Sequence, residues 1–207
     1  MWRANLSVLK RSIMYFEASG FANTSSVIEA VRERMSVGDV EMVVVPVTTG
    51  KTAELFAQEL KDKGKIVSIS EDEAMVACKR IAYQDQGLLG RLVRKRLETA
   101  MQESDRRLRR EALDMTFLPF CGETYTAVRE TLYAFGQGMK VAVEVSVAAV
   151  EVGKVRPYSK IIAVGGTGEG TDTAIVVRAS PQKEAFGRDL KKRLSIQEII
   201  AMPIEKL

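Results

Sequence analysis

Apolar residues recur along this chain with two periods, one typical of helices and one typical of strands. After Asn23 and Thr24, either of which can cap a helix, they return at the spacing of one helix face, which predicts a helix over residues 25–36. The run EMVVVPV then ends at Val47. It is too short for a typical helix and rich in valine, as expected of a buried strand in a parallel sheet. The apolar positions of the helix are Val27, Ile28, Val31 and Met35.

The alternation continues beyond this strand. The stretch TTGKTAELFAQELKDKGK has helical apolar spacing and predicts a helix that ends at Gly64, and KIVSIS predicts the next strand. EDEAMVACKRIA predicts a further helix, DMTFLPF a strand, and ETYTAVRETLYAFGQG a helix that ends at its glycines. Strands that alternate with helices in this way indicate an α/β fold in which helices cover the sheet.

Two later stretches differ in how clearly their pattern can be interpreted. In MKVAVEVSVAAVEVG the valines alternate like those of a strand over residues 141–147, whereas the length and the alanines fit a helix buried on most sides. Both alternatives stay open on periodicity. In KIIAVGGTGEGTDTAIVV, residues 160–177, β-branched apolar runs flank a glycine-rich loop, which predicts strand, loop and strand.

Composition indicates one folded domain. The 207 residues are 46% hydrophobic and 28% charged, which predicts a single α/β domain over residues 1–207, with residues 1–13 as an N-terminal extension. No stretch is apolar and long enough to span a bilayer, and the opening lacks the apolar block of a signal peptide. We therefore expect a cytoplasmic protein without a membrane partner. Small α/β domains often pair, so a homo-oligomer is compatible with the sequence.

The inventory of reactive side chains excludes several enzyme classes. The chain has no histidine, which excludes Ser-His and Cys-His dyads and every metal site that contains histidine. Cys78 and Cys121 form neither a disulfide framework nor a metal-ligand spacing, so no metal site is predicted. Glu17, Cys121 and Asp172 are the candidates for acid/base or nucleophilic chemistry, and each such residue is more often structural.

Positive charge is concentrated in residues 86–111, on a background that favours a helix. A surface for nucleic acid is one interpretation, and a solvated helix with scattered ion pairs is the other. We favour the second, because acidic residues interrupt the run and no aromatic residues are interleaved for base stacking. Nucleic acid is thus not an expected partner, although the net charge of +4 is compatible with acidic small ligands.

The turn after the first valine-rich strand is a candidate phosphate site. In VTTGKTA a strand ends, a glycine allows a tight turn, and the first amides of a helix face outward beside a lysine. The stretch is no Walker A motif, since Val45 stands where that motif needs glycine. A threonine-capped helix with an exposed lysine is the plainer alternative. The candidate residues are Thr48, Thr49, Gly50, Lys51 and Thr52.

The loop GGTGEGTDT is the second candidate. It differs from the dinucleotide fingerprint, because its third glycine comes one position early and a strand pattern follows it. Such a loop can present successive N–H groups and threonine hydroxyls to an anion, or it can be a hairpin whose polar side chains bond their own backbone. The candidate residues are Gly165, Gly166, Thr167, Gly168, Gly170, Thr171, Asp172 and Thr173.

These motifs carry a resemblance to a known family. TTGKTA after a strand resembles the effector-phosphate loop of the pyruvate kinase C-terminal domain. The blocks MYFEASG from Met14, FGQGMKVAVEV from Phe135 and GGTGEGTDTA from Gly165 resemble the stand-alone pyruvate kinase C-terminal-like proteins. The resemblance extends to EIIAMP near the end and departs over residues 83–125, where family members have a histidine-bearing segment that this chain lacks.

The resemblance implies a three-layer α/β/α sandwich with a mostly parallel sheet and a helix over residues 139–153. It also implies a phosphorylated ligand, with flavin mononucleotide (FMN) as the cofactor, its phosphate at the TTGKT turn and its ring across the glycine loop. The chain lacks the residues needed for the catalytic barrel of pyruvate kinase. Three functions follow as alternatives: a binding or regulatory module for FMN, which we favour, a module that senses a sugar phosphate, and a flavin-dependent oxidoreductase.

Overall fold

A computed structural model of the protein describes residues 8–47, 50–70, 73 and 123–206. In these residues the strands form a six-stranded sheet in the order β1-β6-β5-β4-β2-β3. The sheet is mostly parallel: β5 alone runs against the others, since it pairs antiparallel with both β4 and β6. This confirms the α/β class. The strands are β1 Met14–Phe16, β2 Met42–Val47, β3 Lys65–Ser70, β4 Lys160–Gly165, β5 Thr173–Arg178 and β6 Ser195–Pro203.

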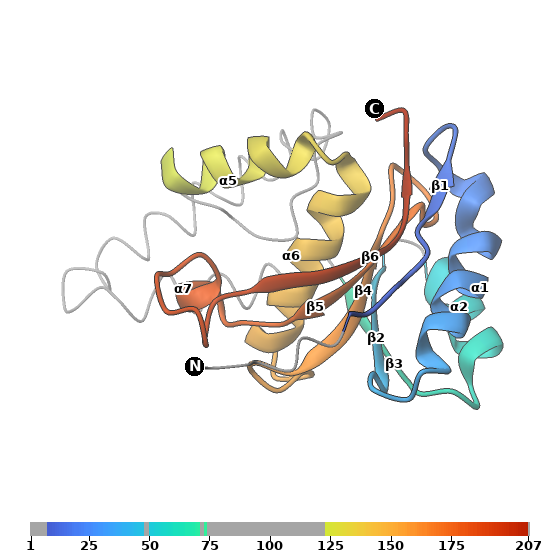
Figure 1. Cartoon of the computed structure of the whole chain (residues 1–207), viewed down its shortest axis with the longest axis horizontal. Helices are drawn as coiled ribbons and strands as arrows, with labels where there is room; N and C mark the ends of the chain where they lie inside the picture. Colours follow the sequence, from blue (N-terminus) through green and yellow to red (C-terminus); the bar gives the residue numbers. More distant parts are fainter. Residues whose placement is uncertain (1–7, 48–49, 71–72, 74–122, 207) are drawn as a thin grey trace, which may run out of the picture.

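Helices cover both faces of the sheet (Figure 1). On one face α1 and α2 pack against each other and against the strands, and on the other face α6 packs on the strands and α5 packs on α6. Along β4, Ile161 and Ala163 belong to the apolar cluster under α6, and Ile162 and Val164 to the cluster under α1 and α2. The helices are η1 Phe21–Asn23, α1 Thr24–Met35, α2 Lys51–Leu60, α5 Glu123–Tyr133, α6 Gln137–Glu151 and α7 Gln182–Ala185.

The stretch whose valines allowed two interpretations is a helix, as the resemblance implies. It forms α6, in which every residue from Gly138 to Val150 is buried. A helix that is covered on all sides needs no polar stripe, so its apolar residues need not follow the helical period. The strand-like alternation over residues 141–147 therefore reflects complete burial and not a β conformation.

The loops of interest gather at one edge of the sheet. β2 and β4 are parallel neighbours, so Val47 and Gly165 end at the same edge, which we call the carboxyl edge. β1 also ends at this edge, at Phe16, because it runs parallel to β6. In open α/β sheets the crevices outside the carboxyl ends of the strands are the usual ligand sites.

Two local predictions need correction. α2 ends at Leu60 and not at Gly64. A Cβ at Gly64 would lie 2.4 Å from the Glu41 carbonyl oxygen and 2.4 Å from Cε of Met35, so glycine is needed there for close packing and not to end a helix. Asn23 occupies the N-cap position of α1, but its side chain makes no capping bond and donates to a carbonyl of the preceding loop.

Other predictions lie outside the described residues and stay predictions. They include the helix in EDEAMVACKRIA apart from Glu73, the strand in DMTFLPF and the basic segment 86–111. Cys78 and Cys121 also lie there. The helix in ETYTAVRETLYAFGQG is confirmed as α5, but it ends at Tyr133 and not at the glycines, since Gly136 is the N-cap of α6 and Gly138 lies inside α6. Of the helices in the described ranges, none combines the length and apolar character needed to cross a bilayer.

Candidate functional site

The start of α2 has the geometry expected of an anion site. Gly50 occupies the N-cap position with φ 89°, a left-handed conformation that glycine adopts without strain, and its carbonyl accepts the Glu54 amide at 3.0 Å. Among the described residues, no side chain caps this helix. The first amides of a helix have no partner within it and favour negative charge. Lys51 is exposed beside them, and Thr52 is half-buried. Thr48 and Thr49 lie outside the described residues.

The glycines of the β4–β5 loop are mostly required by the protein's own packing. A Cβ at Gly165 would lie 2.1 Å from the Gly138 carbonyl oxygen of α6, and a Cβ at Gly166 would lie 2.3 Å from the Gly170 carbonyl oxygen. Gly168 differs from these two glycines, since a Cβ there would meet nothing within 4 Å, although its φ is 74°. A flat ligand therefore cannot use the missing side chains of Gly165 and Gly166, and only the tip of the loop is open.

Asp172 is a buried latch between two loops. Its Oδ2 accepts the backbone amides of Gly20 at 3.0 Å and Thr167 at 3.1 Å, and its Oδ1 accepts the Thr173 hydroxyl at 2.8 Å. The carboxylate is fully buried and has three donors. It thus holds the β1–α1 loop against the β4–β5 loop, which is the structural alternative that the sequence left open for it.

The neighbouring threonines are also internal. Thr171 and Thr173 are fully buried, and the Thr171 amide donates to the Thr24 hydroxyl at 3.1 Å. The Thr171 hydroxyl has no hydrogen-bond partner among the described residues. Because the amides of Thr167 and Thr171 are used within the protein and Gly170 packs against Phe21, the part of this loop that is open to a ligand is its tip, residues 168–169.

Pairing of β2 with β4 brings the two predicted motifs to the same edge of the sheet. Gly50, Lys51 and Thr52 lie at this edge next to the β4–β5 loop, with Gly168 at the loop's tip. Glu17 is exposed at the end of β1, and its backbone carbonyl accepts the Glu205 amide at 3.2 Å. The Glu17 carboxylate makes no hydrogen bond or ion pair with a second acidic or basic side chain in the described residues.

Phe21 is a residue of this edge that sequence reasoning missed. It begins η1, directly before α1, and is 56% exposed. A Cβ at Gly170 would lie 2.8 Å from Cδ2 of Phe21, so the aromatic ring rests against the β4–β5 loop. The signal in the sequence is an aromatic residue between Gly20 and the start of the helix, a place where burial is not expected.

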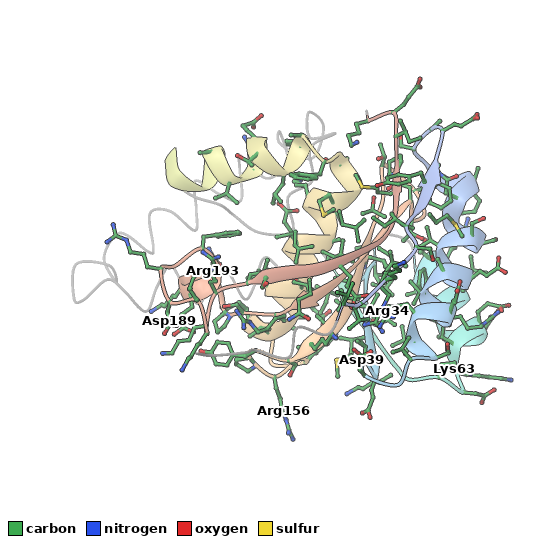
Figure 2. The ribbon with its side chains drawn as sticks, in the orientation of Figure 1. Arg34, Asp39, Lys63, Arg156, Asp189 and Arg193 are labelled. Atoms are coloured by element: carbon green, nitrogen blue, oxygen red, sulfur yellow. The ribbon has the colours of Figure 1, made fainter. Side chains whose placement is uncertain are left out.

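A charged cluster lies at the opposite edge. Arg34, at the end of α1, donates from Nε to Glu198 at 2.6 Å and from Nη1 to Asp39 at 2.6 Å, and Nη2 donates to both carboxylates. Arg34 and Asp39 point toward one another (Figure 2). Lys160 also pairs with Asp39, and Arg11 with Glu198.

Hydrogen bonds in this cluster shift the acidity of its carboxylates. Those from Arg34, and then from Lys160, hold the pKa of Asp39 well below its usual range. The bonds from Arg34 also lower the pKa of Glu198. The pKa of the Arg34 guanidinium rises, chiefly through Glu198 and then Asp39. All three groups therefore stay charged at neutral pH.

A cavity of about 210 Å³ lies beside this cluster, between residues 10–14, α1 and β6. Its charged walls carry both signs, and the buried guanidinium of Arg34 is already saturated by two carboxylates. We favour the carboxyl edge as the candidate site, since its helix amides and Lys51 have no such partners in the part of the chain that the structure describes. Among the described residues, no group of three or more cysteine, aspartate or glutamate side chains is placed to hold a metal ion.

No model of a known protein family matches this chain. The likeness to the stand-alone pyruvate kinase C-terminal-like proteins therefore stays a prediction based on the motifs quoted above. What the structure establishes is the α/β class and the shared edge of the two motifs.

Proposed function

We propose that this protein binds a phosphorylated small molecule at the carboxyl edge, with FMN as the expected ligand. The observation that carries the proposal is the uncapped start of α2, with Lys51 exposed beside it, next to the open tip of the β4–β5 loop. A doubly charged phosphate is stabilised by helix amides and by an adjacent cation. The identity of FMN rests on the family resemblance.

A binding or regulatory role is the form of the proposal that we favour. The buried carboxylate at this edge, Asp172, is occupied by three donors that hold two loops together. A group committed to structure in this way is a poor candidate for a catalytic base. The flavin-dependent oxidoreductase remains the alternative in which the bound cofactor supplies the reactivity.

Replacement of Lys51 tests the phosphate site. Lys51→Ala should weaken FMN binding by about 1–3 kcal/mol, which is the range for loss of one charge-assisted contact, and should leave the melting temperature unchanged. Isothermal titration of wild type and variant with FMN gives both affinities. Ribose 5-phosphate is titrated in parallel, because a sugar-phosphate module binds it as tightly as FMN.

Lys63→Ala is the matched control. Lys63 is exposed in the turn after α2, at the far end of that helix from Lys51 (Figure 2), so its loss changes net charge equally without touching the proposed site. Equal weakening by both variants would show a general charge effect and remove the site from the start of α2. Absence of saturable binding of either phosphate ligand to wild type would refute the proposed function.

A further inference from the structure

We propose that Phe21 is a specificity-determining residue of this site, one that stacks on a planar aromatic group of the ligand. The inference rests on the proposed function, because it takes the phosphate site at α2 as given. It deepens that function by naming the residue that would favour a phosphate ester with an aromatic ring system over a phosphate ester without one. A sugar phosphate has no aromatic ring that could stack on Phe21.

The position of Phe21 carries the inference, since single exposed apolar residues are common on protein surfaces. α1 and α2 pack against each other on one face of the sheet, and each follows a strand that ends at the carboxyl edge. Both helices therefore begin at this edge. Phe21 precedes α1 and Lys51 opens α2, with the β4–β5 loop at the same edge.

The backbone that carries Phe21 is fixed on both sides. The Gly20 amide donates to Asp172 at 3.0 Å, and the Thr24 hydroxyl donates to the Phe21 carbonyl at 2.7 Å. The same Thr24 oxygen accepts the Thr171 amide at 3.1 Å. A group that is held in place before binding loses little freedom when the ligand arrives, so a fixed aromatic ring makes an effective stacking surface.

The missing side chain of Gly170 sets the place of the ring. A Cβ there would lie 2.8 Å from Cδ2 and 2.9 Å from Cα of Phe21, so any larger residue would displace the aromatic ring from the loop. Phe21 is nevertheless 56% exposed, although Cδ2 of its ring lies against the loop. Gly168, on the same loop, is exposed, and a Cβ there would meet nothing within 4 Å.

Titration of Phe21→Leu with two probes tests the inference. FMN carries both a phosphate and an aromatic ring, and ribose 5-phosphate carries the phosphate alone. Leucine keeps an apolar side chain against Gly170 but removes the aromatic face. We expect the Kd for FMN to rise roughly tenfold, as for loss of a stacked aromatic partner, while the Kd for ribose 5-phosphate stays within about twofold of wild type.

Tyr15→Leu is the matched control. Tyr15 is 55% exposed, almost as much as Phe21, but it lies on the other face of the sheet, because its neighbours Met14 and Phe16 pack on the α1 side. It should not change either affinity. Wild-type FMN affinity in Phe21→Leu, with Lys51→Ala still impaired, would overturn the role of Phe21 and leave the phosphate site standing. If wild type binds neither probe, both proposals fail together.

Discussion

At the residue scale, Gly165 and Gly168 are required for different reasons, and the difference gives a direct prediction. Gly165→Ala would place a methyl group 2.1 Å from a backbone oxygen of α6, and we expect a loss of about 3 kcal/mol in unfolding free energy from overpacking. Gly168→Ala meets no atom within 4 Å, so its cost should be about 1 kcal/mol, from its positive φ alone. Urea unfolding measures both; equal losses would contradict this distinction.

The sequence indicated the loop correctly but not what approaches it. At Gly165 a backbone atom does approach closely. That atom belongs to the helix residue Gly138, which lies 27 positions away from Gly165 (165 − 138) and is brought near only by packing of α6 on β4. A contact between residues so far apart in the chain leaves no trace in the local sequence pattern. The sequence alone therefore could not tell whether a ligand or another part of the protein approaches this loop.

At the scale of elements, Asp172 determines how two loops sit on the sheet. Asp172→Ala removes both acceptor oxygens, so the amides of Gly20 and Thr167 lose their partner. We expect a loss of about 2 kcal/mol, the cost of buried donors left without a partner, measured by thermal and urea unfolding. In the variant, hydrogen exchange should also become faster at the backbone amides of these two loops than at those of β4. Unchanged exchange there would argue against the latch.

Helices with one solvent-exposed face could be predicted from the spacing of their apolar residues, and a helix buried on all sides could not. α1 has a buried and an exposed side, so its spacing predicted it to within a residue at each end. α6 has no exposed side, so its valines did not follow the helical period, and only the family resemblance decided between strand and helix. Phe21 was missed for a related reason: exposure of an aromatic side chain depends on the tertiary surroundings.

At the scale of the whole molecule, the ion pairs around Arg34 join separate elements of the fold. They also make the free energy of unfolding depend on pH in the acid range. Folding lowers the pKa of Asp39 and of Glu198, so their contribution is complete above about pH 5, where both carboxylates are ionised even when unfolded. It is lost as the pH falls through the lowered folded values. Wild type should therefore lose stability steadily below about pH 5, as measured by urea unfolding at successive pH values.

Removal of Arg34 isolates this effect. Arg34→Ala should cost about 3 kcal/mol at pH 7, because it leaves two carboxylates without their buried partner, and it should flatten the acid limb of the stability curve. Arg32→Ala is the control on the same helix; its ion pair with Glu59 is exposed, so the cost should stay below about 1 kcal/mol. If Arg34→Ala loses stability below about pH 5 as steeply as wild type does, this pH dependence arises from other groups.

The pairing of β1 with β6 bears on how the chain matures during synthesis. Met14 lies opposite Ala201 and Phe16 opposite Pro203, so the first strand of the sheet finds its partner among residues made almost 190 positions later. While the ribosome is still elongating, β2, β3 and β4 are able to pair, but Met14–Phe16 has no strand to join. The loop that carries Phe21 and Gly20 follows this strand directly and bonds to Asp172. The ligand site that we propose should therefore be complete only after residues 201–203 have left the ribosome, later than the central sheet.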